Sequence, residues 1–131
     1  MKQDISGRAD IEILVDTFYD RVKKDEVIGF IFHRIIGSDW SDHLPTMYQF
    51  WTSALLGTEG YRGNTMAKHI AIDQQIPLQE THFRQWIHLW RETVEDLFAG
   101  PIAEAAKQKG ASMLQLIQFK VTSFRGGKSL I

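Results

Sequence analysis

The chain contains no cysteine, which excludes disulfide bonds, iron–sulfur clusters and zinc sites built on thiolates. No apolar run approaches the roughly 18 residues that a membrane-spanning helix needs. The net charge is -1, from 15 basic and 16 acidic residues, so electrostatics gives no reason to expect a nucleic-acid or membrane partner. The first residues lack the apolar core of a signal peptide. These absences predict a cytoplasmic protein.

The composition of the chain is that of an ordinary globular protein. Apolar residues make up 44% and charged residues 24% of its 131 residues, and this length is typical of one domain. We therefore expect a single domain over residues 1–131. Apolar residues recur at helical spacing over residues 10–24, 40–56, 79–98 and 101–122, with a short apolar helix or turn over 25–32. No alternating strand pattern occurs, so we predict an all-α fold.

A glycine-rich loop and a short apolar stretch separate two of the predicted long helices. The loop, residues 57–64, has three glycines, which favour tight turns. The stretch that follows, residues 65–72, is mostly apolar around His69. We expect it to form one or two helical turns and to end between Asp73 and Pro77.

Hydrolytic, nucleotide and zinc chemistry find little support in the sequence. There is no Gly-x-Ser-x-Gly elbow and no cysteine to act as a nucleophile. The glycines of residues 57–63 match neither a Walker loop nor a dinucleotide fingerprint. The five histidines form no His-Glu-x-x-His motif and no i, i+4 pair, so a metal site built from protein ligands alone is not expected.

Haem makes a smaller demand on the sequence, because the porphyrin supplies most of the iron ligands. The protein has to provide one imidazole and apolar walls. His69 lies between helices rich in phenylalanine and tryptophan and matches this demand. On pattern alone, however, a structural role is the commoner one for a histidine in apolar surroundings. The same holds for Tyr19 and His43, which fall on apolar helix faces, where a backbone partner or a capping role is the alternative.

Four stretches of the chain resemble the truncated haemoglobins, particularly their group III branch. They are residues 14–22 (LVDTFYDRV), 39–51 (DWSDHLPTMYQFW), 61–69 (YRGNTMAKH) and 82–90 (HFRQWIHLW), in the order and spacing of that family. The resemblance covers nearly the whole chain. It implies a truncated globin fold, a two-over-two helical sandwich around haem b. Thr65 departs from the pattern, because proline is common there in the family.

The resemblance also implies which residues form the site. His69 matches the proximal histidine that ligates the iron. Tyr19 and Trp86 match distal donors that face the bound ligand, and His43 matches a distal-helix histidine that gates the pocket or contacts the ligand. Lys68 and Arg62 are near enough in sequence to reach the haem propionates, with a solvated role as the alternative. The residues expected to line the haem are Phe32, His43, Met47, Phe50, Trp51 and Tyr61.

The implied function is binding of dioxygen, nitric oxide or another small diatomic ligand at a histidine-ligated haem iron. A hydrogen bond to a charged acceptor contributes roughly 1.5–3 kcal/mol, so donors such as Tyr19 and Trp86 predict tight oxygen binding. The alternative is an enzyme on the same haem, a nitric oxide dioxygenase or a peroxidase-like protein, served by an unidentified reductase. No residue is assigned as catalytic. A third hypothesis, a helical interaction module without a cofactor, remains because a fold alone does not secure a function.

Overall fold

The structure is a computed structural model that describes residues 1–58 and 65–125, apart from the side chains of residues 65–67 and 125. Its helices in this part of the chain are α1 (Arg8–Lys23), α2 (Gly29–Ile36), α3 (His43–Leu56), α4 (Thr65–Gln75), α5 (Glu80–Leu97) and α6 (Pro101–Arg125). No strand occurs in the described residues, so the predicted all-α class is confirmed. None of the described helices is long and apolar enough to cross a membrane.

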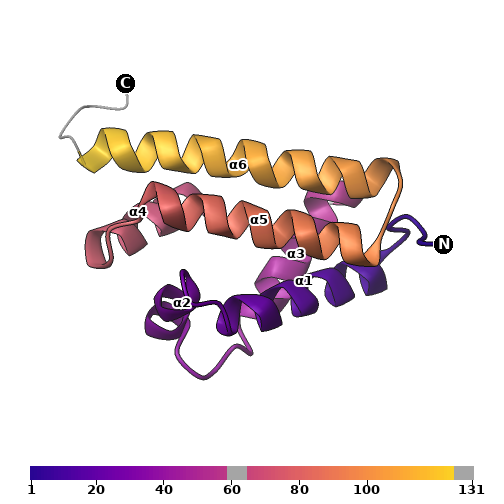
Figure 1. The fold of residues 1–131 in the computed structure, drawn as a ribbon, viewed down its shortest axis with the longest axis horizontal. Helices are drawn as coiled ribbons and strands as arrows, with labels where there is room; N and C mark the ends of the chain where they lie inside the picture. Colours follow the sequence, from indigo (N-terminus) through magenta and orange to yellow (C-terminus); the bar gives the residue numbers. More distant parts are fainter. Residues whose placement is uncertain (59–64, 126–131) are drawn as a thin grey trace.

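The two longest helices, α5 and α6, form the centre of the arrangement. Figure 1 shows them side by side and running in opposite directions, with α1 along the other side of α5. Helix α3 packs against α1, and α4 packs against α6. Helices α2 and α4 lie at the end of the molecule that is away from the N-terminus (Figure 1). The other four helices of the described chain, α1 to α4, therefore lie beside α5 and α6 or at this end of them.

Helix α2 differs from its prediction in position. It was expected over residues 25–32, but it begins at Gly29 and ends at Ile36. The carboxylate of Asp25 accepts hydrogen bonds of 2.9 Å from the backbone N–H groups of Val27 and Ile28. These bonds hold residues 25–28 in a turn, so the helix starts only after them.

Helix α4 is longer than predicted. We expected one or two turns, whereas α4 runs over 11 residues from Thr65 to Gln75. Its end lies between Asp73 and Pro77, as predicted, and the Asp73 carboxylate accepts the backbone N–H of Leu78 at 2.7 Å and organises the turn that follows. Smaller differences occur at α3, which begins at His43, and at α6, which continues to Arg125.

Stacked aromatic rings join α1, α3 and α5. The indole of Trp90 stacks on Trp51, with ring centroids 4.3 Å apart, and on Trp86, with centroids 5.6 Å apart. The ring of Phe18 meets Trp86 and Trp90 edge-on at 5.0 and 5.1 Å. Such aromatic pairs contribute about 0.5–1.5 kcal/mol each beyond the burial of their area. They fix the three helices against one another in the core.

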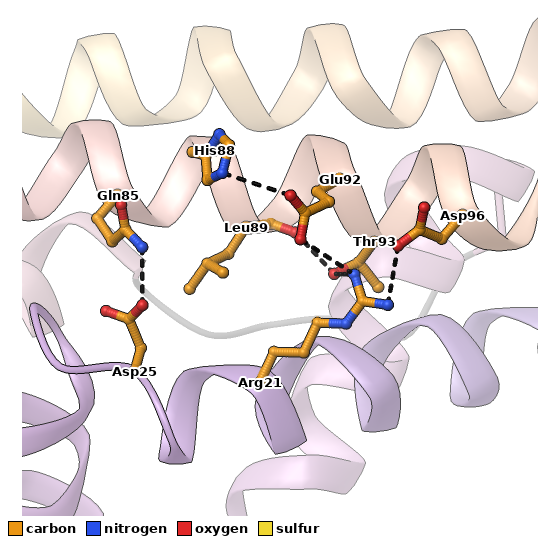
Figure 2. A network of polar contacts seen from close by, with 8 residues as sticks. All are labelled: Arg21, Asp25, Gln85, His88, Leu89, Glu92, Thr93 and Asp96. Atoms are coloured by element: carbon orange, nitrogen blue, oxygen red, sulfur yellow. Dashed lines mark hydrogen bonds and ion pairs between the residues drawn. The ribbon is translucent and has the colours of Figure 1, made fainter.

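A polar network outside the core fixes the alignment of α1 with α5 (Figure 2). Arg21 of α1 donates a hydrogen bond of 3.2 Å to the hydroxyl of Thr93, which is fully buried. Its guanidinium also pairs with Asp96 at 2.9 Å and with Glu92 at 3.8 Å. Exposed ion pairs contribute little to stability, but an arginine with three partners on one helix determines how that helix is aligned.

A second contact in Figure 2 lies nearer the candidate site. The side-chain amide of Gln85 donates a hydrogen bond of 2.7 Å to the carboxylate of Asp25, just after the end of α1. Gln85 directly precedes Trp86, and Tyr19 lies one turn before the end of α1. The polar contacts between these helices therefore also set the relative positions of these two predicted site residues.

The N-terminal segment is fastened to the start of α6. The carboxylate of Asp4 accepts hydrogen bonds from the backbone N–H groups of Ile102 at 3.0 Å and Ala103 at 2.8 Å. Ile5 is buried beside this contact. Gly100 has a φ angle of 142°, and a Cβ atom there would lie 2.5 Å from the Asp4 Cγ atom. Asp4 thus caps α6 from the opposite end of the chain.

We expect the contribution of Asp4 to stability to depend on pH. Burial raises the pKa of its carboxyl group, but hydrogen bonds from Ile102, Ala103 and Ile5 lower it by more, so the pKa lies below its usual value. A lowered pKa gives stability that is present above the unfolded pKa of about 4 and is lost as the pH falls through the folded pKa.

Asp4→Ala should therefore lower the free energy of unfolding by about 1 kcal/mol at neutral pH. The difference from the unmodified protein should shrink below about pH 4 in urea titrations. Asp20→Ala, at an exposed position of α1, is the matched control and should change little. A difference of the same size at both pH values would contradict a role for the ionised carboxylate.

Candidate functional site

A cavity of about 670 Å³ lies among the helices and is lined by side chains from all six that the structure describes. Its volume is within the range of roughly 300–1,000 Å³ that is typical of sites for small organic ligands. Most of the lining side chains are aliphatic or aromatic, and a few polar side chains join them. This combination is typical of a binding site for a mainly apolar group.

The structure brings the predicted site residues to this one cavity. Every predicted site residue that the structure describes lines it: Tyr19, Phe32, His43, Met47, Phe50, Trp51, His69 and Trp86. Tyr61, which was expected to line the haem, and Arg62, which could reach the propionates, lie outside the described residues. The location of these residues is thus observed, while their individual roles remain predictions.

Tyr19 is carried into the interior by the apolar face of α1. It is buried between Phe18 and His43, whose rings meet it edge-on at centroid distances of 4.9 and 5.0 Å. The ring of Trp40 lies 5.4 Å away. Burial raises the pKa of the Tyr19 hydroxyl well above its usual value. The hydroxyl therefore keeps its proton and can donate a hydrogen bond into the cavity.

His43 begins α3 and, within the described part of the chain, is the one residue with a buried side-chain atom that lacks a hydrogen-bond partner. Its Nε2 atom is buried without a hydrogen-bond partner in the described part of the chain. Burial, together with the smaller effect of the nearby positive charges of Lys68 and His69, lowers the pKa of His43 to about 4. The imidazole is therefore uncharged near neutral pH. A buried polar atom without a partner is unusual and indicates that a ligand or cofactor belongs beside it.

Helix α4 brings His69 and Lys68 to the cavity. His69 is half-buried in the cavity wall, and Ile72 lines the wall one turn later. Lys68 is exposed, but it is close enough for its charge to act on His43. The helix thus offers an imidazole inside the cavity and an ammonium group at its edge.

His82 also lines the cavity, but its ring is engaged in capping α5. The backbone N–H of Gln79 donates a hydrogen bond of 2.9 Å to His82 Nδ1, and the Gln79 side chain accepts the backbone N–H of His82 in return. Burial lowers the pKa of His82. Because Nδ1 accepts, the proton of the neutral ring must be on Nε2. This contact explains why a histidine stands at the start of the helix.

Part of the cavity wall was not predicted from the sequence. Ile31 and Ile35 of α2 line it, as do Met113 and Leu114 of α6. The four-residue spacing of the two isoleucines could have indicated a common face, but nearly all of α2 is apolar and its pattern is ambiguous. Trp40, which packs against Tyr19, was predicted only as the start of a helix.

The residues around the cavity fit a haem. The group is flat and apolar over most of its area, and the walls are rich in aromatic and aliphatic side chains. It needs one imidazole, which His69 can supply, and it carries two carboxylates, for which the Lys68 ammonium is a suitable partner. The unpaired Nε2 atom of His43 would also gain a polar neighbour in a loaded cavity.

Comparisons with known proteins agree with this geometry. The family described as bacterial-like globin matches residues 3–122. A group 3 truncated hemoglobin, ctb of Campylobacter jejuni, is 26% identical over 129 residues, covering 96% of this chain and 99% of that protein. A crystal structure of a group III truncated hemoglobin from Campylobacter jejuni matches with a TM-score of 0.83 and 26% identity, over 92% of this chain and 95% of that one. The predicted resemblance and the globin fold are both confirmed.

Proposed function

The chain belongs to the bacterial-like globin family, whose members bind ligands at haem, and on that premise we propose that it binds a small diatomic gas at a haem b held by His69. Dioxygen and nitric oxide are the proposed ligands. The observation that carries the proposal is the single cavity in which His69 meets Tyr19, His43 and Trp86. We also propose that residues 1–131 form one such domain and that the protein acts in the cytoplasm.

When bound, haem supplies an iron that takes an imidazole on one face and the gas on the other. Two histidines besides His43 line the cavity, so the proximal ligand has to be chosen between His69 and His82. The capping bond places the proton of neutral His82 on Nε2, and ligation through that atom would require breaking the cap. His69 lies in the interior of α4 and not at a capping position, and α4 presents it within the cavity wall, which favours His69.

His69→Gly is expected to abolish stable haem retention, because it removes the proposed iron ligand and the other proposed contacts of the haem do not hold the iron. His82→Gln is the matched control, because glutamine at this helix position can keep the capping box while the imidazole is removed. The measurement is the Soret absorption of each purified protein after reconstitution with haem. Free imidazole should restore the band of His69→Gly by occupying the vacated space.

Two outcomes would overturn this assignment. If His69→Gly keeps haem and His82→Gln loses it, then His82 is the ligand. If the unmodified protein shows no Soret band after reconstitution, the proposed function itself is wrong.

On the face of the haem where the gas is proposed to bind, hydrogen-bond donors are expected to hold the ligand. The Tyr19 hydroxyl stays protonated because burial raises its pKa, and the Trp86 indole can only donate. His43 is uncharged and can donate from one ring nitrogen. A ligand that carries partial negative charge would be held by these donors, so slow dissociation of oxygen is expected.

Tyr19→Phe and Trp86→Phe should each speed oxygen dissociation by about tenfold or more, because each loses a hydrogen bond of roughly 1.5–3 kcal/mol. Stopped-flow displacement of oxygen measures the rates. Tyr48→Phe is the matched control: its hydroxyl donates to Asp16 between α1 and α3, and Tyr48 is not among the described residues that line the cavity. Unchanged rates in the first two variants would show that these donors do not face the ligand.

A second candidate function is suggested by the unpaired Nε2 atom of His43 in the same cavity as Tyr19 and Trp86. Three polar groups are more than gas storage requires, and they suit an enzyme that polarises its ligand. In nitric oxide dioxygenation, nitric oxide and dioxygen combine with one electron to give nitrate. A separate reductase would return that electron, since the chain has no dinucleotide-binding fingerprint. Peroxidase-like turnover is the other form of this alternative.

Rapid mixing of the oxygen-bound protein with nitric oxide tests the enzymatic alternative. We expect one nitrate for each oxygen-bound protein and a faster reaction than in His43→Leu, which keeps the volume and removes the polar atoms. Slow or absent nitrate formation in the unmodified protein would leave reversible gas binding as the function.

A further inference from the structure

A glycine in the interior of α6 lies against the aromatic stack of α5. Gly110 occupies a helical position where glycine is less favourable than alanine by about 0.5–1 kcal/mol. A Cβ atom at this position would lie 2.7 Å from Cδ1 and 2.8 Å from Nε1 of Trp90, and 3.5 Å from Cζ3 of Trp86. The first two distances are too short for any side chain. Only glycine therefore lets α6 approach the Trp90 ring this closely.

The Trp90 ring has no room to move away from α6. It is fully buried, and its Nε1–H donates a hydrogen bond of 2.9 Å to the carbonyl oxygen of Ala106, one turn before Gly110. It stacks on Trp51 and on Trp86, with interplanar angles of 22° and 21°. Any group that displaces Trp90 must therefore change how its ring stacks on Trp51 and Trp86.

Both of these neighbours line the cavity, whereas Trp90 is not among the described residues that do. Trp90 is thus an intermediate layer between α6 and the cavity wall. Through the packing of Trp90, the distance between α5 and α6 affects the position of the Trp86 indole, which is half-buried at the cavity.

We propose that Gly110 and Trp90 are positioning residues for the Trp86 indole. Because Gly110 has no side chain, Trp90 can pack closely against α6, and Trp90 in turn holds the Trp86 indole where it can donate a hydrogen bond to the ligand. The inference rests on the proposed function, because it assumes that Trp86 donates to a bound gas. Neither Gly110 nor Trp90 touches the ligand in this arrangement.

Gly110→Ala tests the proposal through the infrared stretch of bound carbon monoxide, which reports hydrogen bonding to the ligand. The stretch should move in the same direction as in Trp86→Phe. Oxygen dissociation should become about twofold to tenfold faster, the factor expected when a hydrogen bond of about 0.5–1.5 kcal/mol is weakened. Ser112→Ala is the matched control, because it raises helix propensity at an exposed position of α6 and should leave both readouts unchanged.

Trp90→Leu supplies the second arm of the test, because it replaces the rigid indole that the new Cβ atom would meet with a shorter and flexible side chain. In the Trp90→Leu protein, the further change Gly110→Ala should hardly move the carbon monoxide stretch. This comparison also decides the question if Gly110→Ala alone does not fold. A double variant that folds and matches Trp90→Leu supports the proposal, and a double variant that does not fold, although Trp90→Leu folds, overturns it.

The remaining outcomes separate this inference from the proposed function. If Trp86→Phe shifts the stretch and Gly110→Ala leaves both readouts unchanged, positioning by Gly110 is wrong and the distal donor stands. If Trp86→Phe itself leaves the stretch unchanged, Trp86 does not meet the ligand, and the positioning proposal is overturned together with that part of the function.

Discussion

The hydrogen bond from the Trp90 indole to the Ala106 carbonyl oxygen joins the two longest helices inside the core. A buried indole N–H has to be paired, so this bond fixes where α6 can lie along α5. Once the ring is held, its two faces determine where Trp51 and Trp86 pack. Those two rings form part of the cavity wall. The shape of the cavity therefore depends on the hydrogen bond between Trp90 and Ala106, which lies outside the cavity.

Burial keeps two polar groups of the cavity wall, Tyr19 and His43, uncharged. It raises the pKa of Tyr19 and lowers that of His43, so both groups stay uncharged near neutral pH. The charge of Lys68 is confined to an exposed position. An interior of this kind can orient a small neutral molecule without drawing in ions, whereas a charged side chain in the same place would carry a shell of water with it.

Helices with a regular apolar face could be predicted from the sequence. Helix boundaries that depend on hydrogen bonds from the backbone to a side chain could not. The helical spacing of residues 79–98 located α5 closely, but Asp25 binds backbone N–H groups before α2, and no periodicity reveals such contacts. The resemblance to the family predicted residues that the structure places in one cavity. It did not reveal that Ile31 and Ile35 of α2 line the cavity or why Gly110 is a glycine, because both depend on contacts between distant segments.

The cap that Asp4 provides for α6 also bears on the order of events in folding. Its partners lie 98 and 99 residues further along the chain, so the contact closes a loop of nearly the whole described structure. Loops of this length form late, after local helices have appeared. During synthesis, Asp4 and Ile5 emerge long before their partners. In an interrupted chain Ile5 would therefore stay exposed in an unpacked segment that proteases can cleave, whereas the complete fold buries it.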